Sequence, residues 1–243
     1  MPGLQLQYSK SEVNRAGNVL RQKLNADLTF AITTPEEFQE LLAAGEVAYH
    51  FRACHAYPLQ KVTMGLRSAV ATETARRPIV AQRFKRFPSM LNKLLRYPDM
   101  SLARMQDIGG CRAILRNGDE VRRVLRRIRR NWRPPDNRIK DYIATPAASG
   151  YRGIHVNVER DSRLIEVQLR TPIQHEWAIA VERMGARHGF DLKSGYGPEE
   201  LLRFFQVASE GMAIEERGET PDEAFMARYG EARRDAAPWI GGS

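Results

Sequence analysis

The sequence has few of the features that mark membrane, secreted or disulfide-rich proteins. It contains only two cysteines, Cys54 and Cys111, which are too few for a disulfide framework and lie in no metal-ligand spacing. Its apolar stretches are much shorter than the roughly 18 consecutive apolar residues of a membrane span. The first residues, 1–8, have neither the basic start nor the apolar run of a signal peptide. We therefore expect a cytoplasmic protein that does not enter a membrane.

Internal repeats and low-complexity tracts are also missing from the 243 residues. A hydrophobic content of 42% is ordinary for a globular chain of this length, which can bury one full core. Basic residues are in excess, with 38 lysines and arginines against 29 acidic residues and a net charge of +9. A charge of this sign favours a partner rich in phosphate, and it leaves open whether that partner is a nucleic acid or a polyphosphorylated small molecule.

Helix-start signals divide the chain into a helical beginning, a mixed centre and a helical end. Ser9-Lys-Ser-Glu12 and Thr34-Pro-Glu-Glu37 read as capping boxes, and a third helix is expected after Pro58. Later helices are expected from Thr171-Pro172, from Pro198 and from the Thr220–Glu223 box. The first hundred residues are therefore predicted to be largely α-helical.

Strands are expected to begin at Cys111 and to continue over residues 139–143, 151–160 and 164–170. The predicted fold class is α+β, with a mixed, mostly antiparallel central sheet flanked by helices. We divide the chain into an N-terminal helical region, a central core and a C-terminal helical tail, at residues 1–78, 79–190 and 191–243.

Two expected strands carry polar side chains on one face. Ile154, Val156 and Val158 alternate with Tyr151, His155 and Asn157, while Ile165, Val167 and Leu169 alternate with Glu166, Gln168 and Arg170. Such a polar face is either a surface that binds a ligand or an ordinary solvated face. The alternation alone does not choose between them.

A second polar cluster precedes the first expected strand. Lys85, Ser89 and Lys93 are spaced i, i+4 and i+8, so on a helix they would form one ridge, with Arg83 just before it. Two ammonium groups and a hydroxyl in line suit a triphosphate, although a solvated basic face has the same pattern. Asp107-Ile-Gly-Gly-Cys-Arg112 follows, where a carboxylate could hold a metal beside glycines that permit close backbone approach.

An arginine-rich helix is expected to begin at Asp119, with Val121, Val124, Leu125 and Ile128 on its buried stripe. Its other face carries six arginines: Arg122, Arg123, Arg126, Arg127, Arg129 and Arg130. They either cover a buried stripe as a solvated face or form a docking face for an RNA backbone.

Three motifs in this order resemble the synthetase domain of the RelA/SpoT family, which includes small alarmone synthetases and related toxins. They are Asp107–Arg112, the Gly-Tyr-Arg loop ending at His155, and Glu166-Val-Gln-Leu-Arg-Thr171. The resemblance runs from about Val80 to about Met184, and because it joins several separated motifs it is more specific than one short motif. It implies the nucleotidyltransferase-like fold of that family.

The resemblance implies a Mg²⁺-dependent pyrophosphokinase. Such an enzyme transfers the β,γ-pyrophosphate of ATP to the ribose 3′-hydroxyl of GDP or GTP and makes the alarmone (p)ppGpp of the stringent response. It assigns Asp107 and Glu166 to magnesium, with Glu166 also activating the hydroxyl. The expected ATP-binding residues are Arg83, Lys85, Ser89, Lys93 and Arg112, and the expected acceptor-binding residues are Tyr151, His155, Gln168 and His175.

Departures from the family pattern leave the acceptor open. The chain has Glu182-Arg183 and Arg187-His188 where the family commonly has Glu-His and Tyr-Lys. One alternative is a toxin of the same fold, with an antitoxin partner, that pyrophosphorylates the 3′-CCA end of tRNA. The arginine helix would then dock the tRNA backbone. Another is a non-catalytic nucleotide- or RNA-binding module. No His is followed by Asp, so we expect no hydrolase domain; the oligomeric state stays open.

Overall fold

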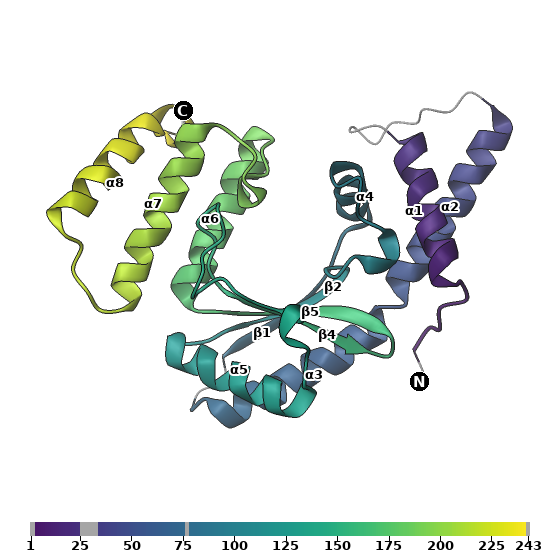
Figure 1. The fold of residues 1–243 in the computed structure, drawn as a ribbon, viewed down its shortest axis with the longest axis horizontal. Helices are drawn as coiled ribbons and strands as arrows, with labels where there is room; N and C mark the ends of the chain where they lie inside the picture. Colours follow the sequence, from purple (N-terminus) through teal and green to yellow (C-terminus); the bar gives the residue numbers. More distant parts are fainter. Residues whose placement is uncertain (1–2, 25–33, 76–77, 242–243) are drawn as a thin grey trace. The chain divides into compact units, whose positions relative to one another are not determined.

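A computed structural model describes residues 3–24, 34–75 and 78–241 of the protein (Figure 1). Within these residues, five strands form a mostly antiparallel sheet in the order β1-β2-β5-β4-β3. Strand β3 pairs with β4 so that Lys140 lies opposite His155. The α+β prediction is confirmed. The strands are β1 (Ile79–Phe84), β2 (Gly109–Ile114), β3 (Ile139–Asp141), β4 (Ile154–Arg160) and β5 (Arg163–Arg170).

Helices occupy most of the remaining described chain. Those before the second strand are α1 (Lys10–Lys23), α2 (Pro35–Ala53), α3 (Ala56–Glu73) and α4 (Phe87–Arg96). Those after it are α5 (Gly118–Trp132), α6 (Pro172–His188), α7 (Glu199–Glu216), α8 (Glu223–Asp235) and α9 (Ala237–Ile240). No helix in the described part of the chain combines the length and the apolar character needed to cross a bilayer.

Reciprocal capping boxes begin three of these helices. Ser9 and Glu12 cap α1, and Thr34 and Glu37 cap α2, as the sequence predicts. Thr171 and Gln174 form a third box at the start of α6, where Pro172 supplies the first helical residue. In each box the side chains bond backbone N–H groups that lack a partner inside the helix, so local sequence fixes where the helix begins.

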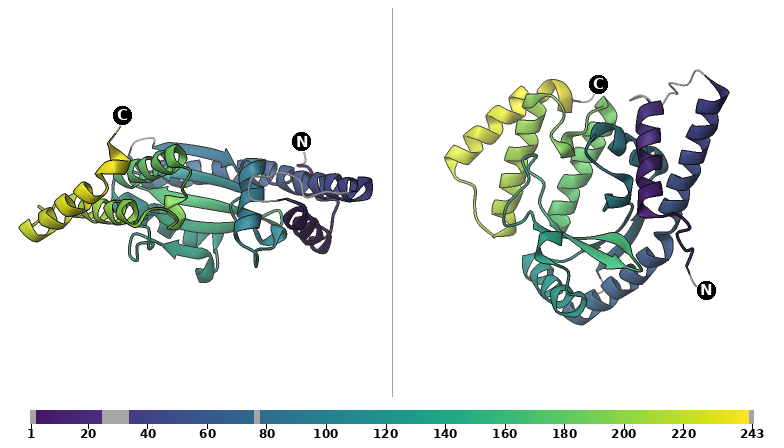
Figure 2. Two further views of the ribbon diagram at one scale, coloured as in Figure 1. Left: turned by 90° about the horizontal axis from the view of Figure 1, so that it is seen from above. Right: turned by 45° about the vertical axis from the view of Figure 1, so that its right-hand side comes forward.

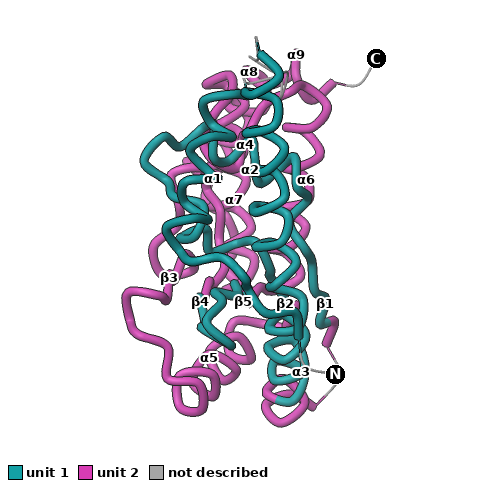
Figure 3. Tube along the Cα trace, turned by 90° about the vertical axis from the view of Figure 1, so that its right-hand side faces the viewer, with its two compact units in different colours: residues 1–68, 80–112, 157–167 teal, residues 69–79, 113–156, 168–243 magenta. Residues whose placement is uncertain are grey.

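The chain forms two compact units, coloured separately in Figure 3. Unit 1 comprises residues 1–68, 80–112 and 157–167, and unit 2 comprises residues 69–79, 113–156 and 168–243. Each unit is thus assembled from stretches that are separated in the sequence. The division of the chain at residues 78 and 190 stays a prediction.

The core of unit 1 is built by its helices. Helices α1 and α2 lie side by side (Figures 1 and 2), and both contribute buried apolar residues to one cluster. That cluster continues through α4 and into the segment before β2, where Leu102 and Ile108 are fully buried. The segment that carries Asp107 is therefore anchored on both sides by core residues, with Ile108 immediately after it.

One core cluster of unit 2 is rich in aromatic residues. Tyr151, Trp177 and Phe205 are buried in one cluster with Leu201 and Ala236, and neighbouring rings meet edge to face or tilted. Helices α7 and α8 lie side by side in all views of Figures 1 and 2. Helices α7 and α9 thus contribute to the same cluster as the Tyr151 loop, whereas the buried α8 residues Phe225 and Ala232 form a separate cluster with Val207 of α7.

Three sequence-based boundaries are wrong. Residues 79–84 form a strand, β1, although we expected strands only from Cys111. Strand β4 begins at Ile154, not at Tyr151, because Gly150 and Gly153 adopt positive φ angles of 86° and 146° that interrupt the extended backbone. Helix α5 is capped by Asn117, whose side chain accepts a hydrogen bond from the Glu120 N–H, and not by Asp119.

The predicted basic ridge is also wrong as a single helical feature. Helix α4 begins at Phe87 with Pro88 in its first turn, so Lys85 precedes the helix and Arg83 lies on β1. Proline favours the first turn of a helix and disfavours helical backbone in the residue before it. Only Ser89 and Lys93 lie on α4.

We expect the buried stripe of α5 to stabilise this helix far more than its exposed arginine Arg126 does. Ile128 is fully buried, whereas Arg126 on the same helix is exposed. Ile128→Ala should lower the free energy of unfolding by about 2–5 kcal/mol, because it removes apolar contacts and leaves a cavity. Arg126→Ala, the matched control, should change it by less than about 0.5 kcal/mol. Urea denaturation followed by circular dichroism measures both, and equal losses would contradict this account of the helix.

Candidate active-site clusters

The residues expected from the sequence to bind substrates divide between the two units. Unit 1 carries the expected ATP and magnesium residues: Arg83, Lys85, Ser89, Lys93, Asp107, Arg112 and Glu166. Unit 2 carries the expected acceptor residues Tyr151, His155, Gln168 and His175 together with the arginines of α5. We describe the two groups separately.

Asp107 is the centre of the group in unit 1. The ammonium nitrogen of Lys85 lies 2.9 Å from Asp107 Oδ2, and that of Lys93 lies 2.9 Å from Asp107 Oδ1. Lys85 comes from the β1–α4 connection, where its backbone N–H donates to the Ile108 carbonyl, and Lys93 comes from α4. Although no helical ridge joins the two lysines, the fold brings both to one carboxylate.

The Asp107 carboxyl group is held in its charged form. Burial would raise the pKa of Asp107, but the Lys85 and Lys93 ammonium groups outweigh this effect and hold the pKa below its ordinary value. A carboxylate with two ammonium partners leaves one net positive charge in this cluster. Such a cluster suits polyphosphate anions and hard cations together.

Glu166 lies on the neighbouring strand, beside the two glycines that follow Asp107. Strand β5 is next to β2 in the sheet, and a Cβ added to Gly110 would lie 3.5 Å from the Glu166 carbonyl oxygen. Glu166 is half-buried on β5. Because Gly110 has no side chain, the backbone of β2 is not covered by a side chain next to Glu166.

Sequence reasoning missed the role of Asn157, which lies on the partner strand of Glu166. Asp161 and Ser162 both have positive φ angles in a two-residue turn, and such a turn pairs Arg160 with Arg163. Counting back along both strands places Asn157 opposite Glu166. The alternation of the sequence places Asn157 on the polar face of its strand. The two-residue turn at Asp161-Ser162 sets the strand register, and it is the sequence signal that links Asn157 to Glu166.

Asn157 also supports the Asp107 segment. It is 4% exposed, and its Nδ2 donates to Gln106 Oε1 at 2.8 Å, one residue before Asp107. Its Oδ1 is buried and has no hydrogen-bond partner within the described part of the chain. A buried amide ties the Glu166 strand pair to the Asp107 segment.

The carboxylates of unit 1 fit magnesium. Mg²⁺ is usually held by one or two protein carboxylates together with substrate phosphates and water, and Asp107 and Glu166 supply such oxygens. The lowered pKa of Asp107 keeps one of these ligands ionised. In the part of the chain that the structure describes, no group of three or more His, Cys, Asp or Glu side chains is gathered as a metal cage.

The three other expected ATP residues lie on different elements. Arg83 is exposed on β1, Ser89 is exposed on the first turn of α4, and Arg112 is half-buried on β2. Their assignment to ATP stays a prediction.

Tyr151 organises the acceptor group in unit 2. Its hydroxyl lies 2.6 Å from His155 Nε2 and accepts a hydrogen bond from Arg170 Nε at 2.9 Å. Arg170 in turn donates to Gln168 Oε1 at 2.7 Å. Three predicted acceptor residues are thus joined in one network through Arg170.

Arg170 is a functional candidate that sequence reasoning left unassigned. It is only 2% exposed, and its guanidinium carbon lies 5.0 Å from the centre of the Tyr151 ring. The signal was present, because alternation along β5 places Arg170 on the same face as Glu166 and Gln168. His175, the fourth predicted acceptor residue, lies half-buried in the first turn of α6.

Tyr151 itself is buried. It is 3% exposed, and besides Arg170 the ammonium nitrogen of Lys193 lies 5.2 Å from its ring centre. Lys193 also bonds Glu182 at 3.2 Å. A nucleotide base could stack on Tyr151 only if a neighbouring group moved off the ring.

The six arginines of α5 divide into three half-buried and three exposed residues. Arg122 bonds Asp141, while Arg123 donates to the Glu73 carbonyl and Arg127 to the Glu73 carboxylate. Arg126, Arg129 and Arg130 are exposed. Three arginines thus bond to other parts of unit 2 from half-buried positions, and the other three are exposed, with Arg129 within 3.6 Å of the exposed Asp136.

Comparison with known proteins finds a family region in the centre of the chain. Residues 82–190 match the model of the region found in RelA and SpoT proteins. This part of the chain is a RelA/SpoT region. The match covers the segments that contain the three motifs recognised in the sequence, so the resemblance drawn from them is confirmed.

Two relatives and one solved structure show how far the similarity extends. A guanosine-3′,5′-bis(diphosphate) 3′-pyrophosphohydrolase of Spiroplasma citri is 27% identical over 207 residues, which cover 82% of this chain and 27% of that protein. An uncharacterized protein of Mycobacterium tuberculosis is 31% identical over 180 residues, 65% of each chain. The chain thus spans about a quarter and about two thirds of the lengths of these two relatives.

The solved structure is that of small alarmone synthetase 1 from Bacillus subtilis bound to its product pppGpp. It superposes with a TM-score of 0.55 at 24% identity, over 70% of this chain and 93% of that chain. The similarity shows that the two proteins share a fold.

The Asp107 cluster predicts a measurable effect on pH dependence. Because the folded-state pKa of Asp107 is lowered, its charge contributes stability above the ordinary pKa of an aspartate, and this contribution is lost as the pH falls through the folded-state pKa. Lys93→Met removes one ammonium partner, so the pKa of Asp107 should rise and the contribution should shrink. Carboxyl-carbon NMR titration and urea unfolding across acidic pH measure these effects.

The matched control is Arg104→Met, which replaces an exposed cation three residues before Asp107 that is not among the groups shifting its pKa. This control should leave the titration of Asp107 unchanged. Equal shifts in the two variants would mean that overall positive charge, and not the Lys93 contact, sets the pKa.

Proposed function

We propose that the protein is a pyrophosphokinase that transfers the β,γ-pyrophosphate of ATP to the 3′-hydroxyl of a guanine nucleotide. The observation that carries this proposal is the meeting of Lys85 and Lys93 on Asp107 within a RelA/SpoT region. Further support comes from the shared fold of the Bacillus subtilis enzyme bound to its product pppGpp. Pyrophosphate transfer needs cations along a triphosphate and a carboxylate near the attacking hydroxyl, and unit 1 supplies both.

The proposed step forms one bond and breaks another. The 3′-oxygen of the acceptor attacks the β-phosphorus of ATP, the bond between that phosphorus and the α,β-bridging oxygen breaks, and AMP leaves. Glu166 accepts the proton of the attacking hydroxyl.

The other residues of this group are proposed to bind ATP. Lys85 and Lys93 exchange part of their contact with Asp107 for contact with phosphate oxygens of ATP. Ser89 donates a hydrogen bond to the triphosphate. Arg83 and Arg112 hold the adenine between their planar guanidinium groups.

Magnesium would be held by Asp107 and Glu166 and would neutralise charge that develops on the phosphate oxygens. The protein's own part is positional. Asn157 and Gln106 link the strand pair of Glu166 to the Asp107 segment, so both carboxylates keep a fixed relation to the backbone of unit 1.

The proposed acceptor residues are those of the Tyr151 network. Tyr151 offers the base an aromatic surface, and His155, Gln168 and His175 offer polar groups. A base that stacks on Tyr151 takes the place of the Lys193 ammonium over the ring. Acceptor binding is therefore proposed to include movement of the Lys193 side chain.

The exposed arginines favour one second candidate, transfer to the 3′-CCA end of tRNA by a toxin of the same fold. Arg126, Arg129 and Arg130 face solvent on one helix and suit an RNA backbone. Arg122, Arg123 and Arg127 favour the nucleotide acceptor instead, because their side chains already bond to Asp141 and Glu73 within unit 2. The cytoplasmic location and an antitoxin partner stay predictions.

The deciding experiment offers several acceptors to the purified protein with γ-labelled ATP and Mg²⁺. Thin-layer chromatography with GDP, GTP, ATP and deacylated tRNA in parallel should show the label on GDP or GTP. Label only on tRNA would replace the proposal by the toxin function, and a steep fall in tRNA affinity with salt would accompany it. A lack of transfer to every acceptor would favour a non-catalytic nucleotide-binding module.

Glu166→Gln tests the proposed base and metal ligand. Because the amide cannot accept the hydroxyl proton and is a weaker magnesium ligand, kcat should fall at least about a hundredfold. The affinity for a non-hydrolysable ATP analogue without Mg²⁺, measured by calorimetry, should stay within about twofold of the wild-type value, since the lysines are unchanged. Glu159→Gln, an exposed isosteric change on β4, is the control and should retain full activity. Full activity of Glu166→Gln would remove this residue from the mechanism.

A further inference from the structure

Helix α7 lies beyond the matched RelA/SpoT region yet bonds directly to the loop that carries Tyr151. The match ends at residue 190, whereas α7 spans Glu199–Glu216. Ser209 Oγ donates to the Gly150 carbonyl at 2.5 Å, and Gln206 Nε2 donates to the Ala148 carbonyl at 2.5 Å. Two carbonyls of the loop that ends at Tyr151 are therefore held by one face of this helix.

Backbone packing reinforces these bonds. Gly150 has a φ of 86°, and a Cβ at this position would lie only 2.9 Å from the Gln206 Cα and 3.2 Å from the Phe205 carbonyl oxygen. The loop therefore needs glycine here both for its backbone angle and for the close approach of α7. Because Gly150 precedes Tyr151 directly, the position of the helix sets where the Tyr151 backbone begins.

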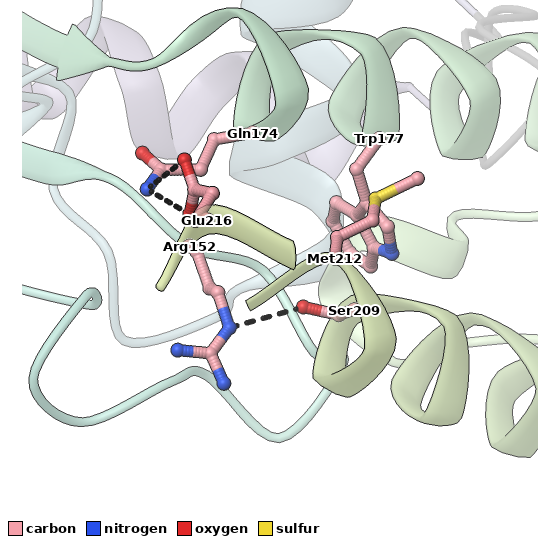
Figure 4. Close-up of a pocket in the computed structure, with 6 residues that line it drawn as sticks. All are labelled: Arg152, Gln174, Trp177, Ser209, Met212 and Glu216. Carbon is pink, nitrogen blue, oxygen red and sulfur yellow. Dashed lines mark hydrogen bonds between the residues drawn. The ribbon is translucent and has the colours of Figure 1, made fainter. Parts of the chain in front are cut away.

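A polar cluster on the same helix fixes α7 against α6 (Figure 4). Glu216 accepts hydrogen bonds from Gln174 Nε2, at 3.0 Å and 3.3 Å to its two oxygens, and from the Thr171 hydroxyl. Earlier along α7, the Trp177 indole N–H donates to the Phe205 carbonyl at 2.9 Å. The helix is thus tied to α6 at two points, one on either side of Ser209.

Ser209 also accepts a hydrogen bond from Arg152 Nε at 3.3 Å (Figure 4), so it contacts the residues on both sides of Tyr151. Arg152, Ser209 and Glu216 line a pocket with a volume of only about 10 Å³, room for about one water molecule. The pocket is therefore too small for a nucleotide, and the cluster acts through the loop.

We propose that Ser209 and Gln206 of α7 are positioning residues for the acceptor, which fix the Ala148–Arg152 backbone and thereby the Tyr151 ring and its network. The inference rests on the proposed function, in which Tyr151 contacts the acceptor base. It extends the acceptor site to a helix outside the family match. The residues proposed to bind ATP belong to unit 1, and we expect them to bind ATP independently of α7.

The test compares Ser209→Ala and Gln206→Ala with a control, Glu200→Ala, an exposed residue near the start of the same helix. Ala is well tolerated in helices, so all three variants should fold. Ser209→Ala and Gln206→Ala, the two variants that lose a bond to the loop, should each raise the KM for the guanine nucleotide roughly three- to tenfold, the effect of losing one hydrogen bond. The KM for ATP should stay within about twofold of the wild-type value. Ser209→Thr keeps the hydroxyl and should restore the acceptor KM.

Two outcomes would overturn the inference. An unchanged acceptor KM in both loop variants would mean that the loop keeps its position without α7. A parallel rise of the KM for ATP and the KM for the acceptor, with no rescue by Ser209→Thr, would mean a general structural defect.

Amide hydrogen exchange separates this inference from the proposed function. If the wild-type protein transfers to no acceptor, the proposed function fails, and exchange of residues 147–153 still decides the role of α7. Faster exchange of this loop in Ser209→Ala than in Glu200→Ala would support the positioning role, and equal exchange would reject it.

Discussion

The buried charge of Arg170 is the constraint on which the Tyr151 network, the proposed acceptor site, depends. A guanidinium group that is 2% exposed must be surrounded by hydrogen-bond acceptors and polarizable rings, because an unpaired buried charge is strongly destabilising. Arg170 meets this demand with the Tyr151 hydroxyl, Gln168 Oε1 and the face of the Tyr151 ring. Its backbone carbonyl also accepts from the Leu115 N–H at 2.8 Å, which fixes the end of β5. The same interactions that bury the charge therefore orient the residues proposed to bind the acceptor.

The Asp107 cluster, the proposed donor site, follows a different electrostatic rule, because its central charge is a partly buried negative one. Asp107 is buried enough for solvation alone to disfavour its ionised form, and Lys85 and Lys93 reverse that preference. The three side chains come from separate elements, each anchored by core residues of unit 1 such as Met90, Leu94 and Ile108. Phosphate oxygens carry the same charge as the carboxylate that the lysines already bond. A triphosphate can therefore share these partners, and magnesium would neutralise part of the negative charge that it adds.

Sequence reasoning was most successful where the physical signal is local. The capping boxes at Ser9 and Thr34 determine helix starts through side chains within four residues, and strand β5 shows its two faces through alternation alone. It failed where a neighbouring residue changed the local preference. Pro88 moved the start of α4 past Lys85, and Gly150 and Gly153 kept Tyr151 out of β4. The helical spacing of Lys85 and Lys93 was thus misleading, although both lysines do reach one carboxylate.

By itself, the sequence determined the α+β class and the resemblance to the RelA/SpoT synthetase domain, and it named most of the residues proposed to carry the chemistry, because these depend on periodicity, helix caps and short motifs. Only the tertiary structure decided which of those residues meet. Three contacts show this: two lysines meet Asp107, Tyr151 is buried beside Arg170, and Ser209 bonds to Gly150. The residues in each contact are 14 to 59 positions apart in the sequence. Such contacts arise from packing of the whole chain. No spacing within one helix or strand encodes them, and for that reason the sequence could name Tyr151 but could not reveal that α7 holds its loop.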